Sequence, residues 1–361
     1  MLKRSLELLK KLESSGFKAY IVGGFVRDCL IKRQSSDVDI CTNAKPKDLL
    51  NVFPDAILPK EKYGSVTLLY KGIRFEITTF RKEIRYENRK PIEIEYTDDF
   101  EEDIRRRDFT VNTLCMNSDG DLIDILNGKE DIKNRVIKVV GDVNKKFEED
   151  PLRMLRAVRF ATKLNFKLDE SVIAGIKNNA KYILNLSYDR KKDELIKILV
   201  CNNADYGIKM IIDLCLDKYL ELSNLNKMII TGDILGMLSQ LNIVNIYPFS
   251  NNEKECINNI NNIVNKKSID NVDLYNYGLY VCQIAADILN INRKILIRAE
   301  KKLPIRSKRD ICISADEICN LLNIRPNGVL KEVYKSLEKE ILCGNILNKK
   351  EDLKKYILNN Y

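Results

Sequence analysis

The segment 20–40 combines a glycine pair with two aspartates, and this pattern strongly constrains what the chain can fold into. An apolar run ends at Gly23 and Gly24, and the residues after them predict a short helix and then a strand that carries Asp37 and Asp39. Glycines at the start of a helix let backbone N–H groups approach a phosphate. Aspartates two positions apart on a strand point to one face and can hold a Mg²⁺ ion. The segment therefore predicts an anion-binding turn beside a hard-metal site, which suits transfer of a phosphoryl or nucleotidyl group.

The composition narrows the classes of chemistry that remain. The chain has 361 residues, enough for two or three domains, and its 61 basic against 52 acidic residues give a net charge of +9. This excess favours a polyanionic partner. Since the chain has no histidine, Ser-His-Asp and Cys-His catalysis and histidine-liganded zinc are excluded. The ten cysteines show no Cys-x-x-Cys spacing, so we expect buried thiols in a reducing cytoplasm and no zinc or redox site.

The order of strand-like and helical segments predicts an α+β protein. Short strand-like runs alternate with helical stretches as far as residue 140, and apolar residues recur at helical spacing beyond it. We therefore predict a catalytic head domain over 1–140, a helical neck over 141–225 that selects the nucleotide and binds RNA, and a helical body and tail over 226–361. No run approaches the ~18 apolar residues that a membrane span needs, so no membrane association is expected.

A third carboxylate is a candidate for the metal site. Glu76 lies in a strand-like run, 74–80, with apolar neighbours, where an unpaired carboxylate is costly. If this strand lies beside the one that carries Asp37 and Asp39, Glu76 joins their site. A strand glutamate that pairs with a surface lysine is the alternative.

The segment 149–160, Glu-Asp-Pro-Leu-Arg-Met-Leu-Arg-Ala-Val-Arg-Phe, predicts the start of a helix. Pro151 suits the first turn of that helix and Asp150 its N-cap. Arg153, Arg156 and Arg159 follow at intervals of three and form a slowly drifting stripe. A capping aspartate, one partner arginine and two solvated arginines are the alternative interpretation.

Three further charged segments differ in their patterns. The segment 105–112, Arg-Arg-Arg-Asp-Phe-Thr-Val-Asn, offers guanidinium groups for phosphate oxygens and, in Asp108 and Asn112, partners for a ribose hydroxyl. The segment 81–100 is dense in charge and predicts a mobile hairpin or loop. In the segment 186–195, Arg190 and Glu194 are spaced as a helical pair, which we interpret as a structural brace.

The glycine–aspartate unit resembles the nucleotidyltransferase superfamily that includes DNA polymerase β. The form Gly-Gly-Phe-Val-Arg-Asp over 23–28 is similar to the class II (bacterial-type) tRNA nucleotidyltransferase and poly(A) polymerase branch. The segments 105–112 and 149–160 resemble the family's Arg-Arg-Asp-Phe-Thr-Ile/Val-Asn and Glu-Asp-x-x-Arg motifs. The segment 186–195 resembles its Ser-x-Glu-Arg-Ile-x-x-Glu-Leu motif but has Asp189 for the glutamate and Lys191 for the isoleucine.

This resemblance implies a polymerase-β-like nucleotidyltransferase head followed by an all-helical neck, body and tail. It implies that Asp37 and Asp39 are catalytic and hold Mg²⁺, with Glu76 as a third catalytic carboxylate. The residues that it implies for nucleotide binding are Gly24, Arg27, Arg107, Asp150, Arg153, Arg156 and Arg159.

The resemblance also implies that Asp150 and Arg153 read the incoming base. A carboxylate accepts from an exocyclic amine and a guanidinium donates to a ring nitrogen, so the pair fits cytosine and adenine. Uracil and guanine are mismatched twice, at about 1–3 kcal/mol for each buried unpaired group. Such a pair chooses C or A without a nucleic-acid template.

The expected function is therefore addition of CCA to the 3′ end of tRNA from CTP and ATP, with release of pyrophosphate and with Mg²⁺ as cofactor. No obligatory protein partner is inferred. Alternatives are an enzyme that adds only A or only CC, a bacterial poly(A) polymerase, and a non-catalytic RNA-binding protein. Relatives that add only C tend to have a shortened loop at 81–100, so its length here argues for addition of A.

Overall fold

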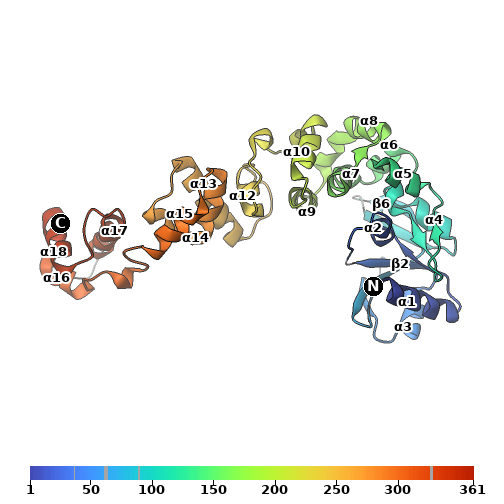
Figure 1. Ribbon diagram of the computed structural model, residues 1–361, viewed down its shortest axis with the longest axis horizontal. Coiled ribbons are helices and arrows are strands. Elements are labelled where there is room, and N and C mark those ends of the chain that lie inside the picture. The colour runs from blue at the N-terminus through green and yellow to red at the C-terminus, as the bar shows by residue number, and fades with distance from the viewer. Residues whose placement is uncertain (36, 61–63, 88–89, 326–327) are drawn as a thin grey trace. The chain divides into compact units, whose positions relative to one another are not determined.

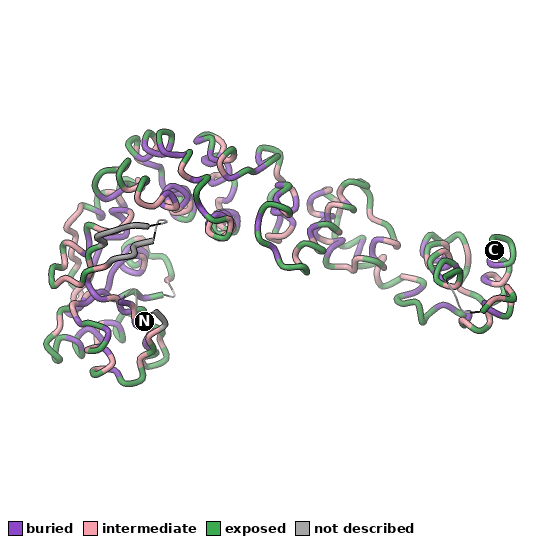
Figure 2. Tube along the Cα trace, turned by 180° about the vertical axis from the view of Figure 1, so that it is seen from behind, coloured by how far each residue is buried: buried purple, intermediate pink, exposed green. Residues whose placement is uncertain are grey.

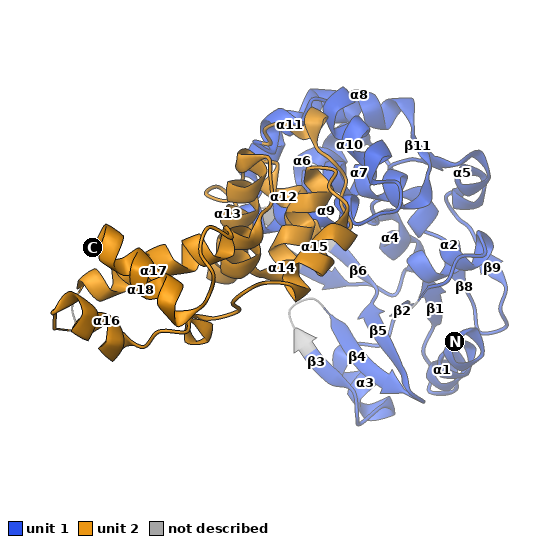
Figure 3. Cartoon of the chain, turned by 60° about the vertical axis from the view of Figure 1, so that its left-hand side comes forward, with its two compact units in different colours: residues 1–221 blue, residues 222–361 orange. Residues whose placement is uncertain are grey.

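The computed structural model describes residues 1–35, 37–60, 64–87, 90–325 and 328–361 (Figure 1). Buried residues recur along the helices and strands, so each part of the chain contributes to a core (Figure 2). The chain divides into two compact units, Met1–Glu221 and Leu222–Tyr361 (Figure 3). The head–neck boundary at 140 and the neck–body boundary at 225 remain predictions.

A mixed sheet forms the centre of the first unit, with strand order β3-β4-β5-β2-β1-β8-β9. Its strands are β1 (Ala19–Val22), β2 (Val38–Thr42), β3 (Ile57–Lys60), β4 (Ser65–Tyr70), β5 (Ile73–Thr79), β8 (Cys115–Met116) and β9 (Leu122–Ile123). A separate antiparallel pair consists of β6 (Arg81–Glu87) and β7 (Lys90–Tyr96). The helical elements of this part are α1 (Leu2–Ser14), α2 (Gly24–Leu30), α3 (Pro46–Val52), α4 (Phe100–Arg105) and the 3₁₀ turn η2 (Thr110–Asn112).

The register of β2 and β5 shows whether the strand that carries Glu76 lies beside the strand that carries Asp39. The two strands are parallel neighbours, and Asp39 lies opposite Glu76. Val38 and Ile40 on β2 and Phe75 and Ile77 on β5 are buried on one face of the sheet, and Asp39 and Glu76 between them point to the other face. The condition under which Glu76 approaches the aspartates is therefore met.

The expected hairpin or loop at 81–100 is largely the β6–β7 pair. Residues 88–89, which lie between these strands, are outside the described residues. The pairing confirms a hairpin but does not test whether it takes part in nucleotide choice.

Helices dominate the rest of the first unit. They are α5 (Gly128–Asn134), α6 (Val143–Glu149), α7 (Leu152–Leu164), α8 (Glu170–Asn179), η3 (Ala180–Asn185), α9 (Tyr188–Leu199), α10 (Ala204–Asp213) and α11 (Leu216–Tyr219). One detail differs from an all-helical neck, because β11 (Lys167–Leu168) pairs in parallel with β10 (Val136–Ile137). This short ladder joins the end of α7 to the chain that enters the helical part.

The start of α7 lies one residue later than predicted. Pro151 is the N-cap, and Asp150 is the C-cap of α6. The Asp150 carboxylate still accepts a hydrogen bond from the backbone N–H of Leu152, at 3.2 Å. Asp150 therefore stays fixed at the junction of two helices.

The second unit is helical throughout its described residues. Its elements are η4 (Leu225–Lys227), α12 (Ile234–Ser239), α13 (Asn251–Lys266), α14 (Asn271–Ile288), α15 (Arg293–Lys301), η5 (Lys308–Asp310), α16 (Ala315–Leu322), α17 (Gly328–Leu342) and α18 (Lys350–Asn360). One buried cluster gathers α13, α14 and α15 around Ile263 and Cys282, and another gathers α16, α17 and α18 around Leu337. Among the helices of the described ranges, none combines the length and apolar character needed to cross a bilayer.

Gly128 provides a test of the packing between α5 and η2. A Cβ at this position would overlap the backbone oxygen of Thr110 and lie 3.1 Å from its carbonyl carbon. Because backbone atoms cannot rotate away, we expect Gly128→Ala to lower the free energy of unfolding by about 1–3 kcal/mol, measured by urea unfolding of the full chain. Gly232→Ala is the control, since its Cβ would meet nothing within 4 Å, and equal stability of the two variants would contradict this packing.

Candidate active site

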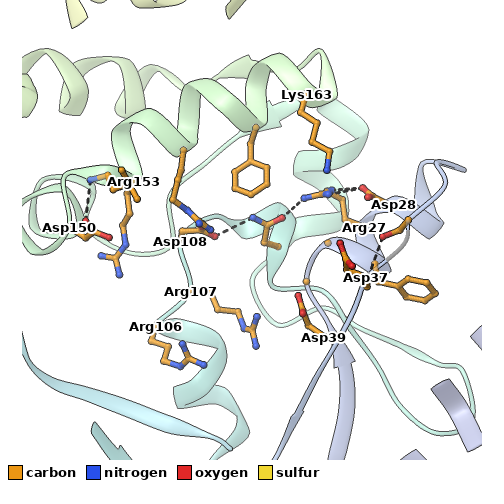
Figure 4. A pocket seen from close by; sticks show the side chains of 18 of the residues that line it. Arg27, Asp28, Asp37, Asp39, Arg106, Arg107, Asp108, Asp150, Arg153 and Lys163 are labelled. Atoms are coloured by element: carbon orange, nitrogen blue, oxygen red, sulfur yellow. Dashed lines mark hydrogen bonds and ion pairs between the residues drawn. The ribbon is translucent and has the colours of Figure 1, made fainter. Parts of the chain in front are cut away.

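A cavity of about 570 Å³ in the first unit collects most of the residues singled out in the sequence (Figure 4). Its walls come from the turn before α2, from β2, from the segment 106–112 and from α7. The lining residues are Gly23, Gly24, Phe25, Arg27, Asp28, Ser35, Asp37, Asp39, Arg81, Arg106, Arg107, Asp108, Asn112, Asp150, Leu152, Arg153, Arg156, Phe160, Lys163 and Arg190.

Eight of the ten predicted site residues line this cavity. They are Gly24, Arg27, Asp37, Asp39, Arg107, Asp150, Arg153 and Arg156. The other two, Glu76 and Arg159, are not among its lining residues. Glu76 lies opposite Asp39 on the neighbouring strand β5, and Arg159 lines a neighbouring cavity.

The carboxylates on β2 and β5 repel one another. Enclosure raises the pKa of Asp39 to about 6, and the charges of Glu76 and Asp37 act in the same direction, while Arg107 opposes them. A divalent cation would relieve this repulsion, and carboxylate oxygens are ligands that Mg²⁺ prefers. Asp37 and Asp39 therefore fit a hard metal ion.

The described residues provide no cluster of three or more His, Cys, Asp or Glu side chains placed to hold a metal. Asp37 and Asp39 would thus act as a pair, with further ligands supplied by substrate oxygens or water. A metal-binding role for Glu76 remains a prediction.

A buried chain of hydrogen bonds connects α2 with α7. Arg27 donates to Asp28 at 2.8 Å and also to the side-chain oxygen of Asn112. Asn112 donates to Asp108 at 3.2 Å, and Arg156 donates from Nε to the other oxygen of Asp108 at 2.9 Å. The dashed lines across the centre of Figure 4 follow part of this chain. Arg27 and Asp28 are almost fully buried, so in the structure the Arg27 side chain is engaged within the protein.

The pair of Asp108 and Arg156 shows strong electrostatic coupling. Burial opposes the charged form of Asp108, but the Arg156 guanidinium and the hydrogen bonds from Asn112 and Phe109 together lower the pKa of Asp108 to about 2. Asp108 in turn raises the pKa of Arg156. Both groups are therefore charged at neutral pH, and Arg156 is held against the cavity wall.

Arg106 and Arg107 share one buried partner. Asp103, at the end of α4, lies 2.7 Å from a terminal nitrogen of Arg106 and 3.1 Å from one of Arg107. Burial disfavours the charge on Arg107, yet Asp103 keeps its pKa above the usual range. Asp103 thus fixes two cations that line the cavity.

The predicted base-reading residues each have a protein partner. Asp150 accepts from a terminal nitrogen of Arg190 at 3.1 and 3.2 Å. Arg153 donates to Glu149 at 3.1 Å and to the backbone oxygen of Lys146 at 3.0 Å. The pairing of Arg190 with Asp150 differs from the helical pair with Glu194 that the spacing predicts, because α9 brings Arg190 to the start of α7.

Arg159 instead pairs with Glu194. Its Nε lies 3.2 Å from a carboxylate oxygen of that buried residue. The aromatic ring of Phe160 lies beside three guanidinium groups, with 4.5 Å between its centroid and Arg159, 5.5 Å to Arg156 and 5.6 Å to Arg27. Phe160 thus fills the space between the cations, and Arg159 braces α7 against α9.

Several cavity residues received no individual role from the sequence, among them Arg81, Lys163 and Ser35. Lys163 lies on the same helix as Arg153 and Arg156, and an extension of that cationic stripe would have indicated it. Arg81 begins the charge-dense segment 81–100, whereas no comparable pattern marks Ser35.

The comparisons with known protein families divide the chain into three parts. The family described as "Poly A polymerase head domain" matches residues 19–138. The family described as "Probable RNA and SrmB- binding site of polymerase A" matches 165–224, and "tRNA nucleotidyltransferase domain 2 putative" matches 239–357. The first match confirms the α+β class with a polymerase-β-like head.

Full-length relatives give the same result. The CCA-adding enzyme of Ligilactobacillus salivarius is 32% identical over 97% of this chain and 95% of its own length. The CCA-adding enzyme of Staphylococcus haemolyticus is 31% identical over 98% of this chain and 96% of its own length. The crystal structure of the Bacillus stearothermophilus CCA-adding enzyme in complex with CTP is 25% identical, with a TM-score of 0.83 and coverage of 99% of this chain and 96% of its own.

Thermotoga maritima CCA-adding enzyme complexed with tRNA shows the same fold at 20% identity, with a TM-score of 0.68 and coverage of 99% of this chain and 94% of its own. The nucleotidyltransferases of this family depend on a metal ion. With relatives of this similarity along almost its whole length, the chain belongs to the CCA-adding enzyme family of tRNA nucleotidyltransferases.

Proposed function

We propose that this protein adds C, C and A in turn to the 3′ end of tRNA, using CTP and ATP. The observation that carries this proposal is that one cavity brings together the glycine turn, the aspartate pair and the Asp150–Arg153 region. A phosphate-binding turn, a metal site and a base-reading element are the three parts that nucleotidyl transfer without a template requires.

The reaction can be followed bond by bond. The 3′-hydroxyl oxygen forms a bond to the α-phosphorus, the bond from that phosphorus to the oxygen bridging to the β-phosphate breaks, and pyrophosphate leaves with the electron pair. The hydroxyl proton is lost to water. We propose Asp37 and Asp39 as the residues that hold Mg²⁺, which supplies activation of the hydroxyl and neutralisation of the triphosphate when bound. The backbone at Gly24 and the guanidinium of Arg156 orient the phosphates, with Arg107 beside them.

Base choice rests on Asp150 and Arg153. Arg190 and Glu149 hold these two side chains at the cavity wall, and the incoming base would replace these protein partners. Cytosine or adenine would exchange a donor and an acceptor with them, whereas uracil or guanine would leave both groups mismatched. The same protein pair would thus serve CTP and ATP.

The remainder of the chain is proposed to hold the tRNA. The family that matches residues 165–224 is described as a probable RNA and SrmB binding site, and the structure of a Thermotoga maritima relative is of a complex with tRNA. The net charge of +9 suits an RNA partner. We propose the cytoplasm as the compartment, which agrees with the ten free cysteines.

The proposal is tested with three tRNA transcripts that end before CCA, after C and after CC. Each is incubated with single and mixed nucleotides and Mg²⁺, and the 3′ ends are sequenced. Addition of C, C and A that then stops is expected. Addition of A alone to the CC-ended transcript would identify an A-adding enzyme, and a long run of A would identify a poly(A) polymerase.

Loss of either Asp37 or Asp39 tests the metal assignment. Asp37→Asn or Asp39→Asn removes an anionic metal ligand that is worth several kcal/mol to the transition state. We expect nucleotide incorporation to fall by about a thousandfold or more, with the circular dichroism spectrum unchanged. Asp121→Asn, at an exposed turn distant in sequence, is the matched control. Substantial activity in the Asp37 or Asp39 variant would contradict the assignment.

Arg153→Ala tests how the base is read. Without this guanidinium, discrimination between CTP and UTP should fall by roughly 10- to 100-fold, because a penalty of about 1–3 kcal/mol for a mismatched group is lost. The kinetics of incorporation with each nucleotide measure this ratio. The exposed Arg105→Ala variant is the control, and an unchanged ratio in Arg153→Ala would count against the pairing scheme.

Asp108→Asn tests the ion pair that fixes Arg156. The folded pKa of about 2 lies below the ordinary value of about 3.9. The stabilisation is therefore complete above pH 4 and is lost as the pH falls towards 2. We expect the variant to be about 2 kcal/mol less stable at pH 7, with a smaller difference at pH 3, as measured by urea unfolding. A difference that stays constant with pH would show that Asp108 contributes no electrostatic stabilisation.

A further inference from the structure

A second cavity adjoins the active site and is strongly cationic. Its volume is about 630 Å³, and it shares two lining residues, Phe160 and Lys163, with the cavity that holds the aspartate pair. The remaining walls are Arg33, Arg159, Lys197, Val200, Cys201, Asn202 and Asn203. The two cavities thus meet at Phe160 and Lys163, in the last turns of α7.

The charges in this second cavity are not balanced. Among the described residues, Arg33, Arg159, Lys163 and Lys197 line it and no acidic side chain does. Glu194 lies behind the wall, where it pairs with Arg159 at 3.2 Å and with Lys197 at 3.2 Å. One carboxylate for four cations leaves a large positive excess, which favours a polyvalent anion.

Contacts within the wall hold these cations close together. Arg33 donates to the backbone oxygen of Lys163 at 2.6 Å, which fixes the loop after α2 to the end of α7. Partial burial lowers the pKa of Lys163, and the charges of Arg27, Arg33 and Arg159 lower it further, although Asp28 opposes them. The repulsion among these groups would be relieved by a bound anion.

The order of residues along α7 shows where the second cavity lies relative to the proposed nucleotide site. Asp150 and Arg153, proposed to read the base, stand at its N-terminal end, Arg156 follows, and Lys163 is near its C-terminal end. Ten residues of helix span about 15 Å. The second cavity therefore lies beyond the triphosphate-binding part of the active site, on the side away from the base.

We propose that this second cavity binds the pyrophosphate that leaves after each nucleotide addition. The inference rests on the proposed nucleotidyl transfer, which produces one pyrophosphate per step. The forked donors of Arg33 and the ammonium groups of Lys163 and Lys197 suit the oxygens of a small, highly charged diphosphate. Lys163, which borders both cavities, would pass the anion from one to the other.

The test uses Arg33→Gln, Lys197→Gln and the double variant of the full chain, because these two residues line the second cavity and do not line the active-site cavity. Lys177→Gln, on α8 at a different cavity, is the matched control. Binding of inorganic pyrophosphate is measured by calorimetry with EDTA present. Product inhibition by pyrophosphate, the KM for CTP and the Kd for tRNA are measured with Mg²⁺.

We expect the double variant to bind pyrophosphate about tenfold more weakly, and pyrophosphate to inhibit it less by a similar factor. The KM for CTP and the Kd for tRNA should not change. Unchanged pyrophosphate binding would overturn the proposal. A parallel rise in the KM for CTP would instead assign these cations to the triphosphate, and weaker tRNA binding alone would assign them to an RNA phosphate. Failure of the wild-type protein to extend tRNA would refute the proposed function. The calorimetric result would still test pyrophosphate binding, because calorimetry needs no turnover.

Discussion

The buried hydrogen-bond chain from Asp28 through Arg27, Asn112 and Asp108 to Arg156 determines how the two halves of the active site meet. At one end, α2 follows the glycine turn, and at the other, α7 carries the nucleotide-facing arginines. Its two ion pairs, Arg27 with Asp28 and Arg156 with Asp108, are joined through the neutral amide of Asn112, so each charge has a partner. Removing one member would leave the next one buried and unpaired, which costs more than the lost hydrogen bond alone.

Much of this site follows from local sequence patterns. The glycine turn and the aspartate strand are close in sequence, so their geometry depends on a few backbone rules. The sequence could not predict that the strands of Asp39 and Glu76 are neighbours, because strand order depends on tertiary packing. The structure shows that they pair in parallel. The partner of Arg190 was missed for a related reason. Spacing pointed to Glu194 on the same helix, but the fold places Asp150 closer, and Glu194 pairs with Arg159 instead.

One departure from the family pattern, at Lys191, has a physical explanation. Lys191 occupies a position that is usually isoleucine, and it is almost completely buried. Its stem fills the apolar space, while its ammonium lies 3.4 Å from the backbone oxygen of Tyr219 and 4.6 Å from the Tyr188 ring centroid. Burial lowers the pKa of this lysine, although Glu221 acts against the shift. The helical bracing therefore survives a change from an apolar to a basic side chain.

A crystal structure of the protein with CTP and Mg²⁺ would test most directly the claim that protein side chains alone read the base. The account predicts that Asp150 turns from Arg190 to the exocyclic amine of cytosine, that Arg153 donates to the ring, and that the phosphates lie between Gly24 and Arg156. A cytosine bound away from Asp150 and Arg153, with their present ion pairs intact, would contradict it.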